Sequence, residues 1–459
     1  MEISLITAVV LVLAVVGFFL GRSRALATVG GRARDLHSLP GHYGCYVAVW
    51  CGVPALLLTL VWSFFQGSIV ESFLVSGLPG AQGLGEAELG LLVNDIKNLA
   101  GGDIVSKEID PEMQAAADLY SSLQTMAFSA LAILSLALAI GGTALAWRHV
   151  SPRFAARERV EKVVRIFLIV SSTIAIFTTV GIVLSLLFEA LRFFNLIPFT
   201  DFLFGLEWSP QTALRADQVG STGAFGAVPL FAGTFLITLI AMVVAAPIGL
   251  MSAIYLSEYA PHKVRSTVKP LLEILAGIPT VVYGFFAALT VAPFIRDAGS
   301  GLGLDVSSES ALAAGVVMGI MIIPFVSSLS DDVINAVPQS LRDGAYALGA
   351  TQSETVKQVI LPAALPGIVG SIMLAISRAI GETMIVVMAA GLAANLTANP
   401  LESVTTVTVQ IVTLLVGDQE FDSAKTLAAF ALGLVMFCIT LSLNVIALHV
   451  VQKYREQYE

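Results

Sequence analysis

The stretch RDGAYALGATQSETVKQVILP, Arg342–Pro362, organises the rest of the chain. It is polar to mixed in character and lies between two long apolar segments. Residues 341–348 predict a short helix, which Gly349 would end because glycine readily adopts the left-handed conformation found after helices. A second helix should begin at residues 353–355 and stop before Pro362, since proline disfavours helical geometry in the residue that precedes it. We therefore expect a helix–turn–helix between two membrane-spanning segments.

Long apolar runs account for most of the remaining sequence. The chain has 459 residues, of which 56% are hydrophobic and 12% charged, and its mean hydropathy is +0.87. Apolar runs of about 20 residues are long enough to cross the hydrocarbon core of a bilayer as helices. We predict an all-α polytopic membrane protein with about nine transmembrane helices, at residues 3–20, 46–65, 123–147, 166–191, 230–256, 270–294, 310–329, 363–390 and 426–450. The three cysteines and five histidines are scattered, so no metal or cofactor site is expected.

The positions of the basic residues predict the orientation of the chain. Arg22 and Arg24 follow the first apolar run and no basic residue precedes it, the reverse of a cleaved signal peptide. With the N-terminus outside and the C-terminus in the cytoplasm, most of the 24 lysines and arginines fall in cytoplasmic segments, as the positive-inside rule requires. The most basic of these segments, residues 148–165, would lie beside anionic membrane lipid. Arg342–Pro362 is then cytoplasmic as well.

Two charged residues, Arg378 and Glu382, lie deep in the predicted helix 363–390. They are four residues apart and would share one helical face. Charges at that depth cost several kcal/mol, so they normally face a polar pathway or each other. The planar guanidinium fork of arginine suits a tetrahedral oxyanion and stays charged at any relevant pH. We favour a place on a substrate path, while a structural salt bridge, or pairing with another subunit, is the alternative.

The spacing within Arg342–Pro362 resembles the cytoplasmic signature loop of ABC importer permeases. That loop usually reads Glu-Ala-Ala, three residues, Gly, nine residues, Ile, one residue, Leu-Pro. The positions that correspond to it here are Asp343, Gly344, Ala345, Gly349, Val359, Leu361 and Pro362. Asp343, Gly344 and Val359 depart conservatively from Glu, Ala and Ile. In the family this loop docks into a separate ATPase, so the resemblance implies an ATPase-coupling role for these residues.

Residues 377–383, SRAIGET, are similar to the membrane Arg/Glu motif of the permeases of phosphate-specific ABC importers, in particular the C-type subunit. Supporting matches lie at 233–234, 253–260, 272–279 and 282–284, and the resemblance covers about residues 165–455. It implies a six-helix half of a path for inorganic phosphate in the bacterial inner membrane. Expected partners are phosphate, a second (A-type) permease, a dimer of ATP-binding subunits, an extracytoplasmic phosphate-binding protein and membrane lipid. No cofactor, metal or nucleic acid is expected.

The resemblance also divides the chain. Residues 161–459 would form the permease core, with the cytoplasmic ATPase-coupling loop at 331–362. Residues 1–160 would be an N-terminal extension with three transmembrane helices and an acidic extracytoplasmic loop at 67–122. That loop lacks the D-x-D-x-D-G pattern of a calcium site, so a solvated acidic face is the better interpretation. The family pattern leaves the role of this extension open.

Other functional classes fit the sequence less well. No G-x-x-x-x-G-K-[ST] occurs, which predicts a transport subunit without an ATPase motif of its own and not an enzyme. An intramembrane hydrolase would carry G-x-S-x-G or H-E-x-x-H, and neither is found. An ATP-independent secondary transporter would show related halves and several midplane ionisable groups. A permease for sulfate, molybdate or phosphonate stays open, because the preference for phosphate rests on the resemblance.

Overall fold

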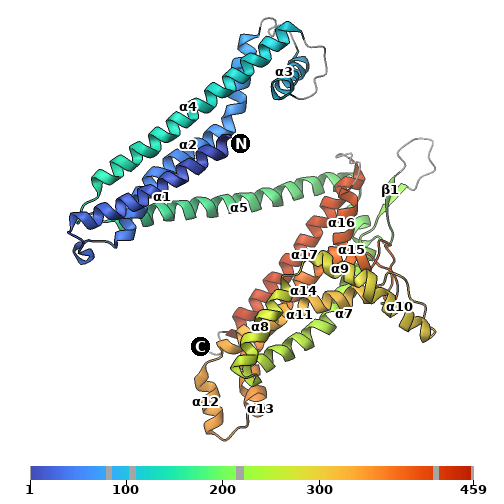
Figure 1. Ribbon diagram of the computed structural model, residues 1–459. Coiled ribbons are helices and arrows are strands. Elements are labelled where there is room, and N and C mark those ends of the chain that lie inside the picture. The colour runs from blue at the N-terminus through green and yellow to red at the C-terminus, as the bar shows by residue number, and fades with distance from the viewer. Residues whose placement is uncertain (1, 79–84, 103–109, 213–221, 417–422, 456–459) are drawn as a thin grey trace. The chain divides into compact units, whose positions relative to one another are not determined.

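The computed structural model describes residues 2–78, 85–102, 110–212, 222–416 and 423–455. It divides into two compact units, Met1–Phe177 and Thr178–Glu459 (Figure 1). The described residues contain nine helices that are long and apolar enough to span a membrane, and each overlaps one predicted span. The predicted all-α polytopic fold is therefore confirmed. The same residues also hold one short antiparallel hairpin that was not predicted, β1 (Trp208–Thr212) and β2 (Thr222–Phe225).

Unit 1 is built on three long helices, α1 (Glu2–Thr28), α2 (Pro40–Gly77) and α4 (Pro111–His149). They run side by side (Figure 1), and a 3₁₀ turn, η1 (Ala33–Asp35), lies in the α1–α2 connection. Small residues let the backbones approach closely, since a Cβ atom on Gly142 would lie 2.1 Å from the carbonyl oxygen of Trp50. The hydroxyl groups of Thr59 and Ser135 hydrogen-bond across the same α2–α4 interface at 3.3 Å.

The acidic segment predicted at 67–122 is largely helical where it is described. Its helices are the end of α2, α3 (Glu86–Gly101) and the start of α4, which pack through Leu74, Ile96 and Met113. Asp103, Lys107 and Glu108 of the predicted loop lie outside the described residues. The helices extend past the predicted spans because hydropathy marks only the apolar part of a helix and not its polar ends.

Unit 2 contains the end of α5 (Ala156–Leu196), which begins in unit 1, and the elements that follow it. In addition to the hairpin these are α6 (Phe199–Phe204), α7 (Val228–Ile254), η3 (Tyr255–Tyr259), α8 (His262–Ala276), α9 (Thr280–Phe286), η4 (Ala287–Val291), α10 (Ala292–Gly301), α11 (Ala311–Ala336), α12 (Gln339–Ala347), α13 (Gln352–Thr355), η5 (Val356–Ile360), α14 (Leu361–Ile380), α15 (Met384–Ala389), α16 (Val407–Leu415) and α17 (Ala424–Arg455). The turns η3, η4 and η5 are π-helical.

The centre of unit 2 is the packing of α7 against α11 (Figure 1). Buried alanines of both helices, including Ala241, Ala245 and Ala314, form this core with branched side chains. A Cβ atom on Gly319 would lie 2.9 Å from the carbonyl oxygen of Ala241. Small residues thus bring the two helices close enough for extensive van der Waals contact, which is the main attraction between helices in a bilayer.

Three predicted helix boundaries in unit 2 are wrong, and proline or glycine lies at each. The predicted span 270–294 is broken between α8 and α9, because Pro279 disfavours helical geometry in the residue before it. The helix that begins at Gln352 does not stop before Pro362. It continues through the π-helical turn η5 into α14, which begins at Leu361. The predicted span 363–390 ends early, at Ile380, with Gly381 as its cap.

Candidate functional site

Arg378 and Glu382 do not lie on one helical face, so that part of the prediction is wrong. Arg378 is in the last turn of α14, which ends at Ile380, and Glu382 follows the end of the helix. Oε1 of Glu382 accepts a hydrogen bond from the backbone N–H of Met384, at the start of α15, at 3.1 Å. A carboxylate in this place satisfies a backbone donor that a helix start leaves unpaired. The break between the two helices therefore separates the two charges.

The side chain of Arg378 is exposed in this chain. Its guanidinium carbon lies 5.8 Å from the centroid of the Phe325 ring on α11, within cation–π range. Among the described residues no carboxylate pairs with Arg378. Since an arginine at this depth is costly without a polar environment, the geometry requires water, substrate or another subunit beside it.

A buried polar network holds the chain that follows the break. Gln410 of α16 accepts a hydrogen bond from Nε1 of Trp208 at 3.0 Å. Its amide nitrogen donates to the Leu392 carbonyl oxygen at 3.3 Å and to Oγ1 of Thr405 at 3.2 Å. Oγ1 of Thr408 donates to the Glu382 carbonyl oxygen at 2.9 Å. Irregular backbone at membrane depth needs such partners, so this network positions the backbone next to Glu382.

Sequence reasoning missed this network, because it placed residues 391–425 in a segment outside the membrane, between the predicted spans 363–390 and 426–450. Asp418, Glu420 and Asp422 of that segment lie outside the described residues. The nine-residue α16 is too short to span a bilayer as a helix. A polar residue within an apolar run, Gln410 in VTVQIVTLL, was the available signal.

The predicted coupling segment projects from one end of unit 2 as α12 and α13 (Figure 1). Gly349 has φ +87° and turns the chain between them, as expected. Thr351 and Glu354 then form a capping box at the start of α13. Of the predicted coupling residues, Asp343, Gly344, Gly349 and Pro362 are exposed, Val359 and Leu361 are partly buried and Ala345 is buried. The tip of the segment carries Leu348, which is 91% exposed, and Tyr346.

Buried Arg342 fixes the base of this segment. Its Nη2 donates to Oε1 of Glu258 in η3 at 3.0 Å and to the Ile334 carbonyl oxygen at 2.8 Å, and its Nη1 donates to the Val337 carbonyl oxygen. The two carbonyl groups belong to the end of α11, where helix geometry leaves acceptors without partners. Nε2 of Gln352 also donates to the Glu258 carbonyl oxygen, at 2.6 Å. Arg342 and Glu258 thus join α11, α12, α13 and η3, the turn that follows α7.

A second charged cluster ties α8 to α11. Asp331 is 1% exposed and accepts hydrogen bonds from Nη2 of Arg265 at 3.2 and 3.1 Å and from Nζ of Lys269 at 2.8 Å. The hydrogen bond to Asp331 is the main reason that the pKa of Lys269 is raised. Asn335 adds an amide donor at 2.9 Å. The sequence indicates only a basic turn at Arg265 and Lys269, because partners more than 60 positions away leave no local signal.

Two family models match the chain. Residues 7–178 match a family described as phosphate ATP-binding cassette transporter, and residues 245–456 match one described as binding-protein-dependent transport system inner membrane component. The first match covers the N-terminal extension, for which the family pattern considered above had no counterpart.

Individual relatives agree with these models. A Bacillus subtilis protein named "Probable ABC transporter permease protein YqgH" is 33% identical over 52% of this chain and 74% of its own length. The phosphate transport system permease protein PstC 1 of Mycobacterium tuberculosis is 32% identical over 55% of this chain and 81% of its own. For some other phosphate transport system permease proteins the chain spans about half of their length. A chain of a solved bacterial alginate ABC transporter is similar with a TM-score of 0.44 and 15% identity, over 65% of this chain and 97% of that one.

Proposed function

This chain belongs to the family of phosphate transport permeases of ABC importers, and from that premise we propose that it forms one half of an ATP-driven path for inorganic phosphate across the bacterial inner membrane. The family predicted from the sequence is confirmed, and it is a family of transport subunits and not of ATPases. We further propose that the chain pairs with a second, A-type permease, is driven by a dimer of ATP-binding subunits and receives phosphate from an extracytoplasmic binding protein.

The proposed substrate path rests on the charge and exposure of Arg378. It is a permanent cation in a membrane-spanning helix, its side chain is exposed, and no described carboxylate neutralises it. Its planar fork of donors matches the oxygens of a phosphate ion. A neutral path would not need this group, and a charge without a counterion is costly in a bilayer.

Glu382 has a complementary role in this proposal. Its carboxylate is held at the start of α15 by the Met384 N–H, directly after the helix break that follows Arg378. A carboxylate at this place repels phosphate as it leaves Arg378. Transport requires a site that releases its ion as well as binding it, so Glu382 would keep phosphate from remaining at Arg378.

The exposed tip of α12 and α13 supports the proposed contact with an ATPase. Leu348 and Tyr346 present apolar surface there, and Asp343 of the same segment is also exposed; exposed apolar groups with a polar surround are typical of docking sites. The ion pair of Arg342 with Glu258 would transmit movement of the docked segment to α7 and α11.

For the topology we propose an outside N-terminus and a cytoplasmic C-terminus. The C-terminal end of α17 lies at the same end of unit 2 as α12 and α13 (Figure 1), which is consistent with placing both in the cytoplasm. We keep residues 1–160 as an extension with three transmembrane helices and residues 161–459 as the permease core with its coupling loop at 331–362.

Uptake of labelled phosphate tests the proposal. Cells expressing the whole system should lose uptake with Arg378→Ala at unchanged complex levels, whereas Arg296→Ala, which removes an exposed arginine outside the predicted spans, should leave uptake intact. Normal uptake with Arg378→Ala would reduce this residue to a structural role. Transport of sulfate, molybdate or phosphonate in place of phosphate would favour another oxyanion, and uptake that continues without ATP hydrolysis would favour a secondary transporter.

A further inference from the structure

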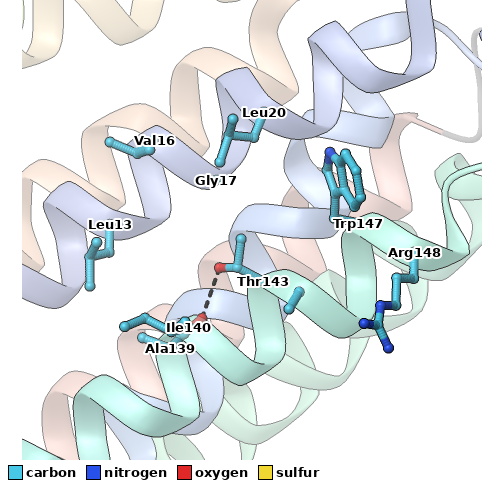
Figure 2. A pocket seen from close by; sticks show the side chains of 10 residues that line it. Leu13, Val16, Gly17, Leu20, Ala139, Ile140, Thr143, Trp147 and Arg148 are labelled. Carbon is cyan, nitrogen blue, oxygen red and sulfur yellow. Dashed lines mark hydrogen bonds between the residues drawn. The ribbon is translucent and has the colours of Figure 1, made fainter. Parts of the chain in front are cut away.

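The surface of α1 in unit 1 carries two neighbouring apolar grooves. The first has a volume of about 500 Å³ and runs between α1 and α4 (Figure 2). Leu13, Val16 and Leu20 of α1 line it together with Ile140, Ala144 and Trp147 of α4.

The second groove, of about 490 Å³, lies along α1, with Phe19 and Leu26 among its lining residues. Val16 and Leu20 line both grooves, so the two grooves adjoin on the surface of α1.

The first groove is suited to hydrocarbon. Apart from Trp147 and Arg148, the polar side chain of its lining is Thr143, whose hydroxyl donates to the Ala139 carbonyl oxygen at 2.8 Å (Figure 2). Its one donor is therefore already used. Residues 139–148 of α4 rise about 14 Å at 1.5 Å per residue. This is about half of the roughly 30 Å hydrocarbon core of a bilayer, which is the depth of a single leaflet.

Arginines lie at one end of the first groove. Arg148 lines this groove, and the guanidinium of Arg24 lies over the Trp147 ring, 4.5 Å from its centroid. Arg22 lines the second groove, and its place two residues from Arg24 on one helix turns it away from Arg24. All three arginines are exposed, and none has a carboxylate partner among the described residues. Arginines without counterions beside an interfacial tryptophan favour a phosphate group at the membrane surface.

We propose that this surface of α1 and α4 binds one anionic glycerophospholipid. One acyl chain lies in the first groove, and the headgroup phosphate lies at its end beside Arg24 and Arg148. An apolar groove of single-leaflet depth that ends at two exposed arginines matches an acyl chain joined to a phosphate. The lipid belongs to the cytoplasmic leaflet if the proposed topology holds, but the site itself does not depend on the transport function.

Native mass spectrometry of the purified full-length chain, titrated with phosphatidylglycerol or phosphatidylcholine, tests this site. Each basic residue near anionic lipid contributes about five-fold in affinity, so Arg24→Ala with Arg148→Ala should weaken phosphatidylglycerol binding by about 25-fold. A matched double variant, Arg32→Ala with Arg153→Ala, removes two exposed arginines that do not line the grooves and should change binding less than about two-fold. Arg24→Lys with Arg148→Lys should keep most of the affinity that the double alanine variant loses.

A groove-filling variant tests the acyl-chain part independently of charge. Ala144→Trp should reduce binding of phosphatidylglycerol although all three arginines remain. Equal affinity for phosphatidylglycerol and phosphatidylcholine would overturn the proposal, and so would undiminished phosphatidylglycerol binding by the Arg24/Arg148 double alanine variant. Lipid bound by the isolated chain but absent from the assembled transporter would also overturn it, since a protein partner would then cover the grooves.

Discussion

Replacing Arg342 with methionine should release the coupling segment from the rest of unit 2. Methionine keeps much of the length and apolar character of the side chain but removes the ion pair with Glu258 and both hydrogen bonds to the end of α11. Removing one partner of a buried ion pair costs about 3–5 kcal/mol. We expect a cost at the lower end of this range, about 3 kcal/mol, because the side chains of Arg342 and Glu258 are 11% and 8% exposed to solvent and so are not fully buried. Since every 1.4 kcal/mol is a factor of ten, the segment should open about 100-fold more often.

Hydrogen exchange followed by mass spectrometry measures this opening. Amides of residues 339–355 should exchange about 100-fold faster with Arg342→Met, while the core of α7 and α11 stays protected. Lys357→Met removes an exposed cation from the same segment and serves as the control. A double variant that adds Glu258→Gln should recover part of the loss, because no buried charge is then left unpaired. Unchanged exchange with Arg342→Met, or equal acceleration in the control, would refute the reasoning.

Three further predictions follow from particular contacts. Leu348→Asp at the exposed tip should abolish co-purification of the ATP-binding subunit without lowering the thermal stability of the chain, and retained co-purification would contradict the docking role. Gln410→Leu leaves the Trp208 N–H without its acceptor and should destabilise the chain by about 1–3 kcal/mol, visible as a lower melting temperature in detergent; an unchanged melting temperature would argue against the network. Gly319→Val should destabilise α7–α11 packing by about 1–3 kcal/mol or more, whereas Gly344→Ala, where a Cβ meets nothing within 4 Å, should be neutral in the same assay.

The helix boundaries show where hydropathy predicts the structure and where it does not. Nine apolar segments were identified correctly, because the cost of exposing polar backbone in lipid forces long apolar runs into helices. The helix break after Ile380 and the short α16 escaped the same reasoning. Hydropathy does not report where a helix ends within an apolar region. The hydrogen bonds of Gln410 to Trp208 and Thr405, and of Thr408 to the Glu382 carbonyl oxygen, make irregular backbone acceptable there.

The sequence likewise predicted one feature of the candidate site and missed another. The turn at Gly349 was predictable because a left-handed φ favours glycine. The separation of Arg378 from Glu382 was not, since four-residue spacing implies one helical face only while the helix continues.

By itself, the sequence determined the membrane class, the nine spans, the family and the turn at Gly349. These follow from composition, local conformational preference and residue spacing along the chain. Only the tertiary structure decided that Arg342 pairs with Glu258, that Asp331 is surrounded by Arg265, Lys269 and Asn335, and that Arg24 of α1 lies over Trp147 of α4 at a groove that Arg148 also lines. The reason is physical: ion pairing and groove shape depend on which helices pack together, and residues far apart in sequence meet only once that packing has formed.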